Sequence, residues 1–453
     1  MTDTETKDSE KESNTLDFSI KLEQQLEKQK EEQYYTSSSN GAKKFHHDVF
    51  GDYLIDQYNI INLDDRLHIY QDGIYEDKER LIKRAMVKEI KSIKRREQSE
   101  VLEYLRSSAP LKEREHPDLI AVKNGVYNIK TDEFLNYSPK HVFTSKINAD
   151  YNPDAYSEVV NDTLITIANE DVQVMNLFTE IIGYLLYRRN FLGKSFLLVG
   201  PGGNGKSTFI NMLSAFVGQE NVSSVPLQDL SERFSKASLY QKFLNAGDDI
   251  PLKSVKDASD FKKFTTGERN NAEFKGENSF EFRNYAKLIF SANDLPRWLE
   301  NSDGIFDRLV IVPLTARLRG TKKQDVFLEE KITTEEARSY LLNIGIKALK
   351  QLIKKRYMSV PDTAESIMTE FKKDNDPLLN FIEFMNEDGQ RGIVERKTFE
   401  VFEDYLAWCE SEGHRFNLTQ RKFTTTIKKY GYDTERITGG EYKGKYIFVP
   451  NIN

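Results

Sequence analysis

The sequence predicts an α/β fold built around a mostly parallel sheet, and three observations lead to this prediction. Residues 195–200, SFLLVG, form a continuous apolar run of the kind found in strands buried on both faces. A glycine-rich turn and an amphipathic segment with helical spacing follow directly. From there to about Thr315, apolar strand segments alternate with helical ones, as in parallel sheets whose strands are joined by helices.

Length and composition limit the classes of protein to consider. The chain has 453 residues, enough for about three domains. Its single cysteine, Cys409, excludes an intramolecular disulfide and a cysteine-based zinc site. No apolar run approaches the roughly 18 residues of a membrane-spanning helix, and no signal or transit pattern opens the sequence. We therefore expect a soluble protein of the bacterial or host cytoplasm with no membrane partner.

Charge is segregated along the chain. The net charge of −7 argues against a wholly basic nucleic-acid coat. Residues 1–45 hold ten Asp/Glu against seven Lys/Arg, whereas residues 413–453 hold eight Lys/Arg against three Asp/Glu. The mildly acidic total therefore hides a basic C-terminal end, and it does not exclude a nucleic-acid partner.

Changes of pattern divide the chain into regions. Short hairpins are predicted at Asp72-Gly73 and Asn124-Gly125. Two helical patterns and a hairpin pattern near the C-terminus follow the order of a winged helix. The predicted regions are a disordered polar arm (1–45), an α+β accessory domain (46–150), a helical linker (151–190), an α/β core (191–320), a helical lid (321–375) and a winged-helix DNA-binding domain (376–453).

Residues 200–207, GPGGNGKS, match the P-loop pattern of Gly, four residues, Gly, Lys and Ser or Thr. Glycines let the backbone wrap closely around phosphate, and the following helix N-terminus faces the negative charge. We expect ATP as ligand, with Lys206 on the β and γ phosphates and Ser207 on Mg²⁺. The expected nucleotide-binding residues are Gly200, Pro201, Gly202, Gly203, Asn204, Gly205, Lys206, Ser207 and Thr208. The alternative is a glycine loop that only matches the pattern.

Two more strand ends carry polar side chains that suit ATP hydrolysis. KFLNAGDDI, residues 242–250, is an apolar strand that ends in acids, and we assign Asp248 to the metal and Asp249 to the attacking water. AKLIFSAND, residues 286–294, ends in Asn293, which is placed to sense the γ-phosphate. The alternatives are an ordinary acidic loop for the first strand and an asparagine cap for the second.

An arginine beyond these strands is a candidate for action between subunits. Arg308 opens the apolar strand of residues 309–314, where it would stabilise charge on a γ-phosphate bound by a neighbouring subunit. The alternative is a surface salt bridge with Asp307 or Asp303.

Two segments are candidates for DNA contact. Phe274 and Lys275 lie near the tip of a predicted hairpin around Gly276, where a cation and an aromatic ring would follow a single strand. A solvated lysine on a turn is the alternative. Residues 418–430 are the predicted recognition helix, with four cations for phosphates or bases: Arg421, Lys422, Lys428 and Lys429.

Four stretches in this order resemble the superfamily 3 helicases of DNA viruses, phages and plasmids. They are GPGGNGKST, NAGDDI, FKKFTTGERNNAEFK and KLIFSANDLP. The likeness is closest to phage and plasmid primase-helicases and to the helicase part of the poxvirus primase-helicase. IYQDGIYE and IAVKNGVYNIKTDEFLNYSPKHVF look like the domain that precedes the ATPase in those proteins. The resemblance covers about residues 60–315 well and the C-terminal region more loosely.

The resemblance implies an AAA+-related ATPase that forms a ring, usually a hexamer, and moves 3′ to 5′ on single-stranded DNA. It makes Lys206 and Ser207 the Walker A pair, and Asp248 and Asp249 the Walker B pair. It also implies Asn293 as the sensor, Lys275 as the pore-hairpin lysine and Arg308 as the arginine finger. Two departures stand out: Thr266-Gly267-Glu268, where the family often has two glycines before the acid, and Asp307-Arg308, where it often has two arginines.

The expected function is an ATP-hydrolysing replicative DNA helicase of a phage, plasmid or mobile element. Expected partners are single-stranded and forked DNA, an origin duplex, further copies in a homo-hexamer, and a separate primase or replication protein. No primase activity is expected in this chain, since Asp64-Asp65 reads better as a turn than as a two-metal site. The alternative is an origin-binding initiator or helicase loader that uses ATP as an assembly switch. A third interpretation, a P-loop kinase or a packaging motor, lacks support because the sequence shows no base-carrying or nuclease site to accompany the P-loop.

Overall fold

The computed structural model describes residues 32–37, 43–247, 258–295, 303–321, 325–387, 392–413 and 418–451. The chain divides into two compact units, Met1–Ile147 and Asn148–Asn453, each considered by itself below. Among the described residues, every helix is too short or too polar to cross a membrane.

In the described residues of the first unit, short hairpins are combined with three helices. Its elements are β1 (Tyr35–Ser37), β2 (Lys43–Phe45), α2 (His47–Tyr58), β3 (Ile61–Leu63), β4 (Arg66–Gln71), β5 (Ile74–Glu76), α3 (Glu79–Glu89), α4 (Arg95–Ser108), β6 (Leu119–Val122), β7 (Gly125–Asn128) and β8 (Phe134–Leu135). The hairpin predicted at Asp72-Gly73 joins β4 to β5, and both turn residues have positive φ, 49° and 88°. Asp64 and Asp65 form a similar turn between β3 and β4, with φ of 52° and 58°, as expected.

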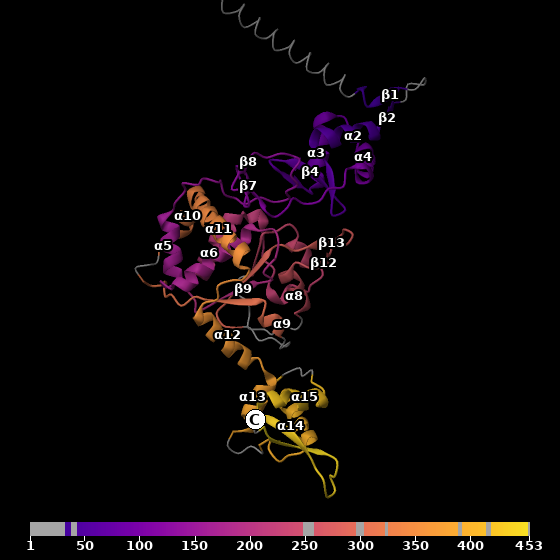
Figure 1. Cartoon of the computed structure of the whole chain (residues 1–453). Helices are drawn as coiled ribbons and strands as arrows, with labels where there is room; N and C mark the ends of the chain where they lie inside the picture. The colour runs from indigo at the N-terminus through magenta and orange to yellow at the C-terminus, as the bar shows by residue number, and fades with distance from the viewer. Residues whose placement is uncertain are drawn as a thin grey trace, which may run out of the picture. The chain divides into compact units, whose positions relative to one another are not determined.

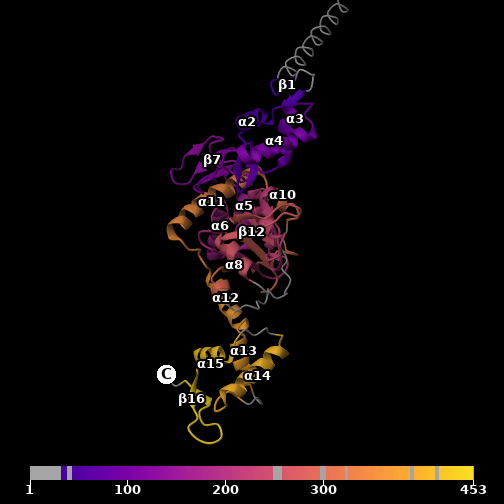
Figure 2. The same ribbon diagram turned by 90° about the vertical axis from the view of Figure 1, so that its right-hand side faces the viewer.

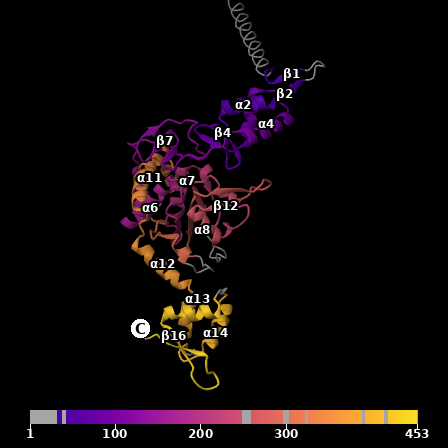
Figure 3. The same ribbon diagram turned by 45° about the vertical axis from the view of Figure 1, so that its right-hand side comes forward.

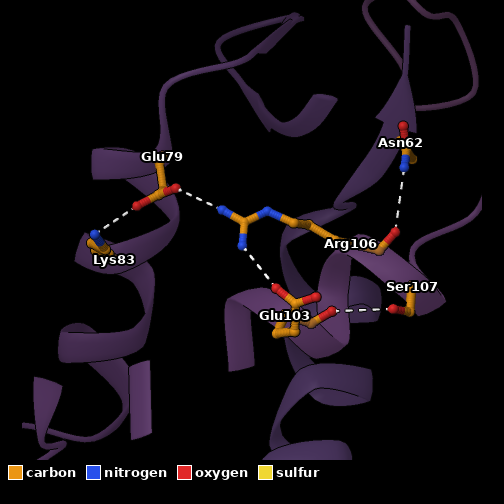
Figure 4. Close-up of polar contacts among 6 residues, drawn as sticks. All are labelled: Asn62, Glu79, Lys83, Glu103, Arg106 and Ser107. Carbon is orange, nitrogen blue, oxygen red and sulfur yellow. Dashed lines mark hydrogen bonds and ion pairs between the residues drawn. The ribbon is translucent and has the colours of Figure 1, made fainter. Parts of the chain in front are cut away.

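Exposed ion pairs connect α3 to α4 in this unit (Figure 4). Arg106 of α4 binds Glu79 of α3 at 3.1 Å and Glu103 of its own helix at 3.2 Å. Lys83 adds a second pair to Glu79 at 2.6 Å. Such exposed pairs contribute only about 0.2–1 kcal/mol each, so the helices are held mainly by their buried apolar residues, Ile82 and Leu105 among them.

The second unit contains a five-stranded sheet in which all neighbouring strands are parallel. The strand order is β10, β11, β14, β9, β15. The α/β class with a parallel sheet is confirmed. The strands of the sheet are β9 (Ser195–Val199), β10 (Val222–Ser223), β11 (Leu244–Gly247), β14 (Lys287–Ala292) and β15 (Leu309–Pro313). A separate hairpin is formed by β12 (Arg269–Ala272) and β13 (Phe280–Arg283). The helices around them are α5 (Glu158–Ile167), α6 (Val172–Leu186), α7 (Lys206–Val217), α8 (Ser259–Thr266), α9 (Asp303–Phe306), α10 (Leu328–Ile332), α11 (Glu335–Lys355) and α12 (Asp362–Asp374). Figures 1 and 2 show this unit with its helices α6 and α11 labelled.

Helices cover both faces of this sheet. Side chains alternate along β9, so Leu197 faces one layer and Phe196 the other. Leu197 belongs to a core cluster with residues of α8, α9 and α12. Phe196 lies instead against Tyr184 of α6, with ring centroids 6.3 Å apart. Burial on both faces explains why the strand is a continuous apolar run.

The long helix α11 packs closely along α6. A Cβ on Gly183 of α6 would lie 2.7 Å from the backbone of Leu349, so a larger residue would force the helices apart. Glu180 of α6 is buried and binds Lys355 and Ser359, because a buried carboxylate requires partners. α11 is capped by Thr334, whose hydroxyl accepts from the amide of Ala337 at 3.2 Å.

Lys287 is a fully buried lysine at the start of β14. Its Nζ donates to the carbonyl oxygens of Tyr187 and Tyr285 at 2.7 and 2.8 Å and to Oδ1 of Asn190 at 2.9 Å. It also lies 4.5 Å from the ring centroid of Tyr184. Burial holds the pKa of this amine well below its ordinary value. The contacts fix the C-terminal end of α6 to the sheet.

The described residues of the C-terminal part form three helices and an antiparallel hairpin (Figures 1 and 3). These are α13 (Pro377–Met385), α14 (Thr398–Ser411), α15 (Gln420–Thr426) with a 3₁₀ turn over Ile427–Tyr430, β16 (Tyr432–Arg436) and β17 (Tyr446–Pro450). A single bridge between Lys397 and Ile447 adds a third chain segment beside the hairpin. The core of this C-terminal part contains Phe381, Tyr405, Phe423 and Phe448. Cys409 is buried in this core, and burial raises the pKa of its thiol.

Candidate nucleotide site and DNA-contact elements

The P-loop connects the end of β9 to the start of α7. Gly203 and Gly205 have φ of 81° and 94°, which side chains other than glycine rarely adopt. A Cβ on Gly205 would lie 2.6 Å from Ile167 Cγ1, so the loop is also closely packed from behind. Ser207 is exposed in the first turn of α7, where its hydroxyl is accessible to a metal, and Thr208 follows it.

Lys206 points back into the loop rather than into solvent. Its Nζ donates to the carbonyl oxygens of Gly200 at 2.5 Å and Pro201 at 3.3 Å and to Oδ1 of Asn204 at 3.3 Å. It also donates to Oδ1 of Asn293 at 3.1 Å. The structure therefore brings the predicted lysine and sensor asparagine into direct contact, although they lie 87 residues apart.

The strand order explains this contact. β14, which precedes Asn293, lies between the P-loop strand β9 and β11. Ala292 at the end of β14 pairs with Val199 at the end of β9, so the side chains that follow them share one edge of the sheet. β11 ends at Gly247 near this edge, since Gly247 pairs with Phe290. The predicted acids Asp248 and Asp249 lie outside the described residues.

Arg308 lies at the opposite edge of the sheet, where the parallel strands begin. It precedes β15, whose first residue, Leu309, pairs with Ser195 at the start of β9. The four residue steps from Ser195 to Val199 amount to about 13 Å of strand. Arg308 therefore cannot reach a phosphate held on the P-loop of its own chain.

The contacts of Arg308 are made within its own segment. Its Nη1 donates to the carbonyl oxygen of Gly304 at 2.5 Å, while Nε is buried without a partner among the described residues. Within the described part of the chain, it makes no ion pair with Asp307. The side chain of Asp303, the other predicted alternative partner, lies outside the described residues.

A second cation beside Arg308 was missed in the sequence. Lys194 Nζ donates to the main-chain oxygen of Asp307, and burial lowers the pKa of the amine while the charge of Arg308 adds to the effect. Lys194 lies just before β9, far from Arg308 in the sequence, so only the strand pairing brings the two together.

The β12–β13 hairpin projects from the core (Figure 3). Its tip is a turn in which the amide of Glu277 donates to the carbonyl of Phe274 at 3.0 Å and Gly276 has φ of 85°. Lys275 is exposed at this tip. Phe274 is partly buried, because it stacks on Phe280 with ring centroids 5.4 Å apart and packs against the core, so Lys275 is the more exposed of the two predicted residues.

The four predicted cations of the C-terminal part are all exposed. Arg421 and Lys422 lie in the first turn of α15, and Lys428 and Lys429 lie on the 3₁₀ turn that follows. Lys428 is paired with Asp433 at 2.5 Å. Arg421 lines a surface hollow with Thr425 of the same helix and Thr434 and Tyr446 of the hairpin.

Comparison with known families supplies the identification. Residues 22–169 match a family model described as D5 N terminal like, and residues 373–450 match one described as poxvirus D5 protein-like. The chain is a protein of the viral primase-helicase type. The intervening residues 198–308 match a family of unknown function (DUF5906). Primase-helicase-type proteins are enzymes of DNA replication.

This primase-helicase-type chain is similar to solved structures, one of which supports its fold. One of them, "The A form apo structure of NrS-1 C terminal region-CTR", has 15% sequence identity and a TM-score of 0.52, and the match covers 87% of this chain and 97% of that one. Another, the A form apo structure of residues 305–718 of the same region, has 14% identity and a TM-score of 0.49 over 89% of this chain and 99% of that one. At this identity, the first likeness concerns the fold alone.

Proposed function

We propose that this primase-helicase-type chain is an ATP-driven, ring-forming replicative DNA helicase that moves on single-stranded DNA. The contact between Lys206 Nζ and Asn293 Oδ1 is the observation that carries the proposal. It joins two side chains that follow adjacent parallel strands, and this supports a role for Lys206 in binding phosphate and for Asn293 in sensing the γ-phosphate.

The residues of the P-loop suit a nucleoside triphosphate. The positive-φ glycines leave the backbone free to approach phosphate, and Lys206 donates to neutral oxygen acceptors of the loop. When nucleotide binds, its phosphate oxygens would replace these neutral acceptors and gain a charge-assisted contact. Mg²⁺, held by Ser207 and by the acid Asp248, would neutralise the charge that develops on the phosphates.

Hydrolysis in this proposal needs two subunits. Asn293 and Asp249 would orient the attacking water on one subunit, and Arg308 of the next would stabilise the charge on the γ-phosphate. The position of Arg308 at the far edge of its own sheet supports action between subunits. A closed ring supplies such an arginine to every site, and we propose a homo-hexamer.

The DNA-contact elements would convert hydrolysis into movement. The exposed Lys275 of each subunit would pair with successive phosphates of one strand, with 3′ to 5′ polarity. We propose that the C-terminal part is a winged helix, because the bridge at Lys397 and the β16–β17 hairpin complete the order of its elements. Its α15 would then bind forked or origin duplex.

Strand displacement tests the proposal directly. The chain is expected to hydrolyse ATP faster when single-stranded DNA is added, and to unwind a fork with a 3′ tail but not one with only a 5′ tail. The Lys206→Ala variant should do neither. An ATPase rate that ignores single-stranded DNA, together with footprinting on duplex but no unwinding, would instead support the initiator or loader function.

A further inference from the structure

A short segment after β15 closes over the P-loop, and residues 314–320 are called the strap here. Its first residue donates from Leu314 N to Val199 O at 2.8 Å and accepts at its oxygen from Asn204 Nδ2 at 2.7 Å. Further along, the amides of Leu318 and Arg319 both donate to the oxygen of Gly203, at 3.1 and 3.3 Å. The strap therefore follows the loop that would hold the phosphates.

Arg319 lies directly against this loop. The three atoms nearest to a Cβ built on Gly203 all belong to Arg319: Cβ at 2.7 Å, Nε at 3.4 Å and Cδ at 3.6 Å. Any residue other than glycine would push the arginine away, quite apart from the φ of 81°. The close approach thus depends on one glycine of the phosphate-binding pattern.

The guanidinium of Arg319 is available to a ligand. The side chain is exposed, and no hydrogen bond or ion pair joins it to any residue that the structure describes. A guanidinium presents several N–H donors in a planar fork that matches phosphate oxygens. Arg317, two residues earlier in the strap, is exposed as well but is not among the atoms nearest to Gly203, so it makes a matched control.

We propose that Arg319 binds the phosphate chain of a nucleoside triphosphate held on the P-loop of its own subunit. The inference rests on the function proposed above. It gives the two ends of β15 separate roles. Arg319 beyond the C-terminal end would hold nucleotide in its own subunit, while Arg308 before the N-terminal end would act on the nucleotide of a neighbour.

The proposal is tested by binding of a fluorescent ATP analogue to the full chain and to its Arg319→Ala and Arg317→Ala variants. Arg319→Ala is expected to weaken binding roughly ten- to a hundredfold, the range of a lost charge-assisted hydrogen bond. Arg317→Ala should stay within about twofold of the parent, since its side chain is exposed and is not among the atoms nearest to Gly203. Arg319→Lys, which keeps the charge but loses the fork, should recover part of the affinity.

Two results would contradict the proposed role of Arg319. Unchanged affinity in Arg319→Ala, or an equal loss in Arg317→Ala, would overturn the role of Arg319. Both side chains are exposed, and an unchanged thermal unfolding midpoint would confirm that the variants fold. Failure of the proposed function looks different: the parent chain and its Lys206→Ala variant would then bind the analogue equally poorly.

Discussion

The two edges of the parallel sheet, one where its strands end and one where they begin, differ in how much of a nucleotide site each contains. At the P-loop edge, Lys206 already contacts both Asn204 and Asn293 within one chain. At the opposite edge, Arg308 and Lys194 place two cations together without a phosphate site of their own. The difference fits the proposal that one edge binds nucleotide and the other completes the site of a neighbour.

The largest effect is expected from the complete edge. Lys206→Ala should reduce ATP hydrolysis to background, because the lysine both holds the P-loop acceptors and would contact the β and γ phosphates. Phosphate release at saturating ATP measures the effect, and Lys263→Ala, an exposed lysine on α8, is the control. If Lys206→Ala hydrolyses ATP at a rate comparable to that of the parent, the P-loop is not the site of hydrolysis.

The opposite edge should affect turnover without affecting binding. Arg308→Ala is expected to lower kcat by about 10³–10⁵, the range measured for arginine fingers. Affinity for ATP should hold, because the arginine lies at the far edge from its own P-loop. The neighbouring Asp307→Asn serves as control. If Arg308→Ala loses ATP affinity and keeps kcat, the two edges do not divide the work in this way.

A moderate effect is expected from the sensor. Asn293→Ala removes the hydrogen bond at 3.1 Å to Lys206, and kcat should fall roughly ten- to a hundredfold, as for a charge-assisted hydrogen bond. Asp294→Asn, at the next and equally exposed position, should change kcat little. Single-turnover hydrolysis separates this chemical effect from product release. An Asn293→Ala variant with the parent rate would show that the contact is only structural.

The smallest effect on the basal rate is expected at the hairpin. Lys275→Ala should leave ATPase without DNA within about twofold of the parent, because the side chain is exposed at the tip of the hairpin. The additional rate produced by single-stranded DNA should be lost. The Lys263→Ala control should keep it. A full DNA response in Lys275→Ala would exclude this lysine as the contact.

Local patterns in the sequence predicted what local geometry determines. The P-loop glycines and the turns at Asp72-Gly73 and Gly276 were predictable, since each needs particular backbone angles within a few residues. Lys206 and Asn293 were each predicted as site residues, but the direct contact between them was not predicted. Lys194 and Arg319 were missed, because their neighbours are distant in the sequence, as the 110 residues between Asn204 and Leu314 of the strap illustrate. Phe274 was predicted as a DNA contact, but the pattern could not show that Phe280 stacks on it.

The most direct test of the division of work between the two edges is ATP hydrolysis by a mixture of two inactive variants. Lys206→Ala keeps Arg308 but lacks a working P-loop, while Arg308→Ala keeps the P-loop. If the site forms between subunits, mixing them before ring assembly should restore ATPase activity at interfaces where an intact P-loop meets an intact arginine. A mixture that remains as inactive as its components, although the two variants assemble together, would contradict the account.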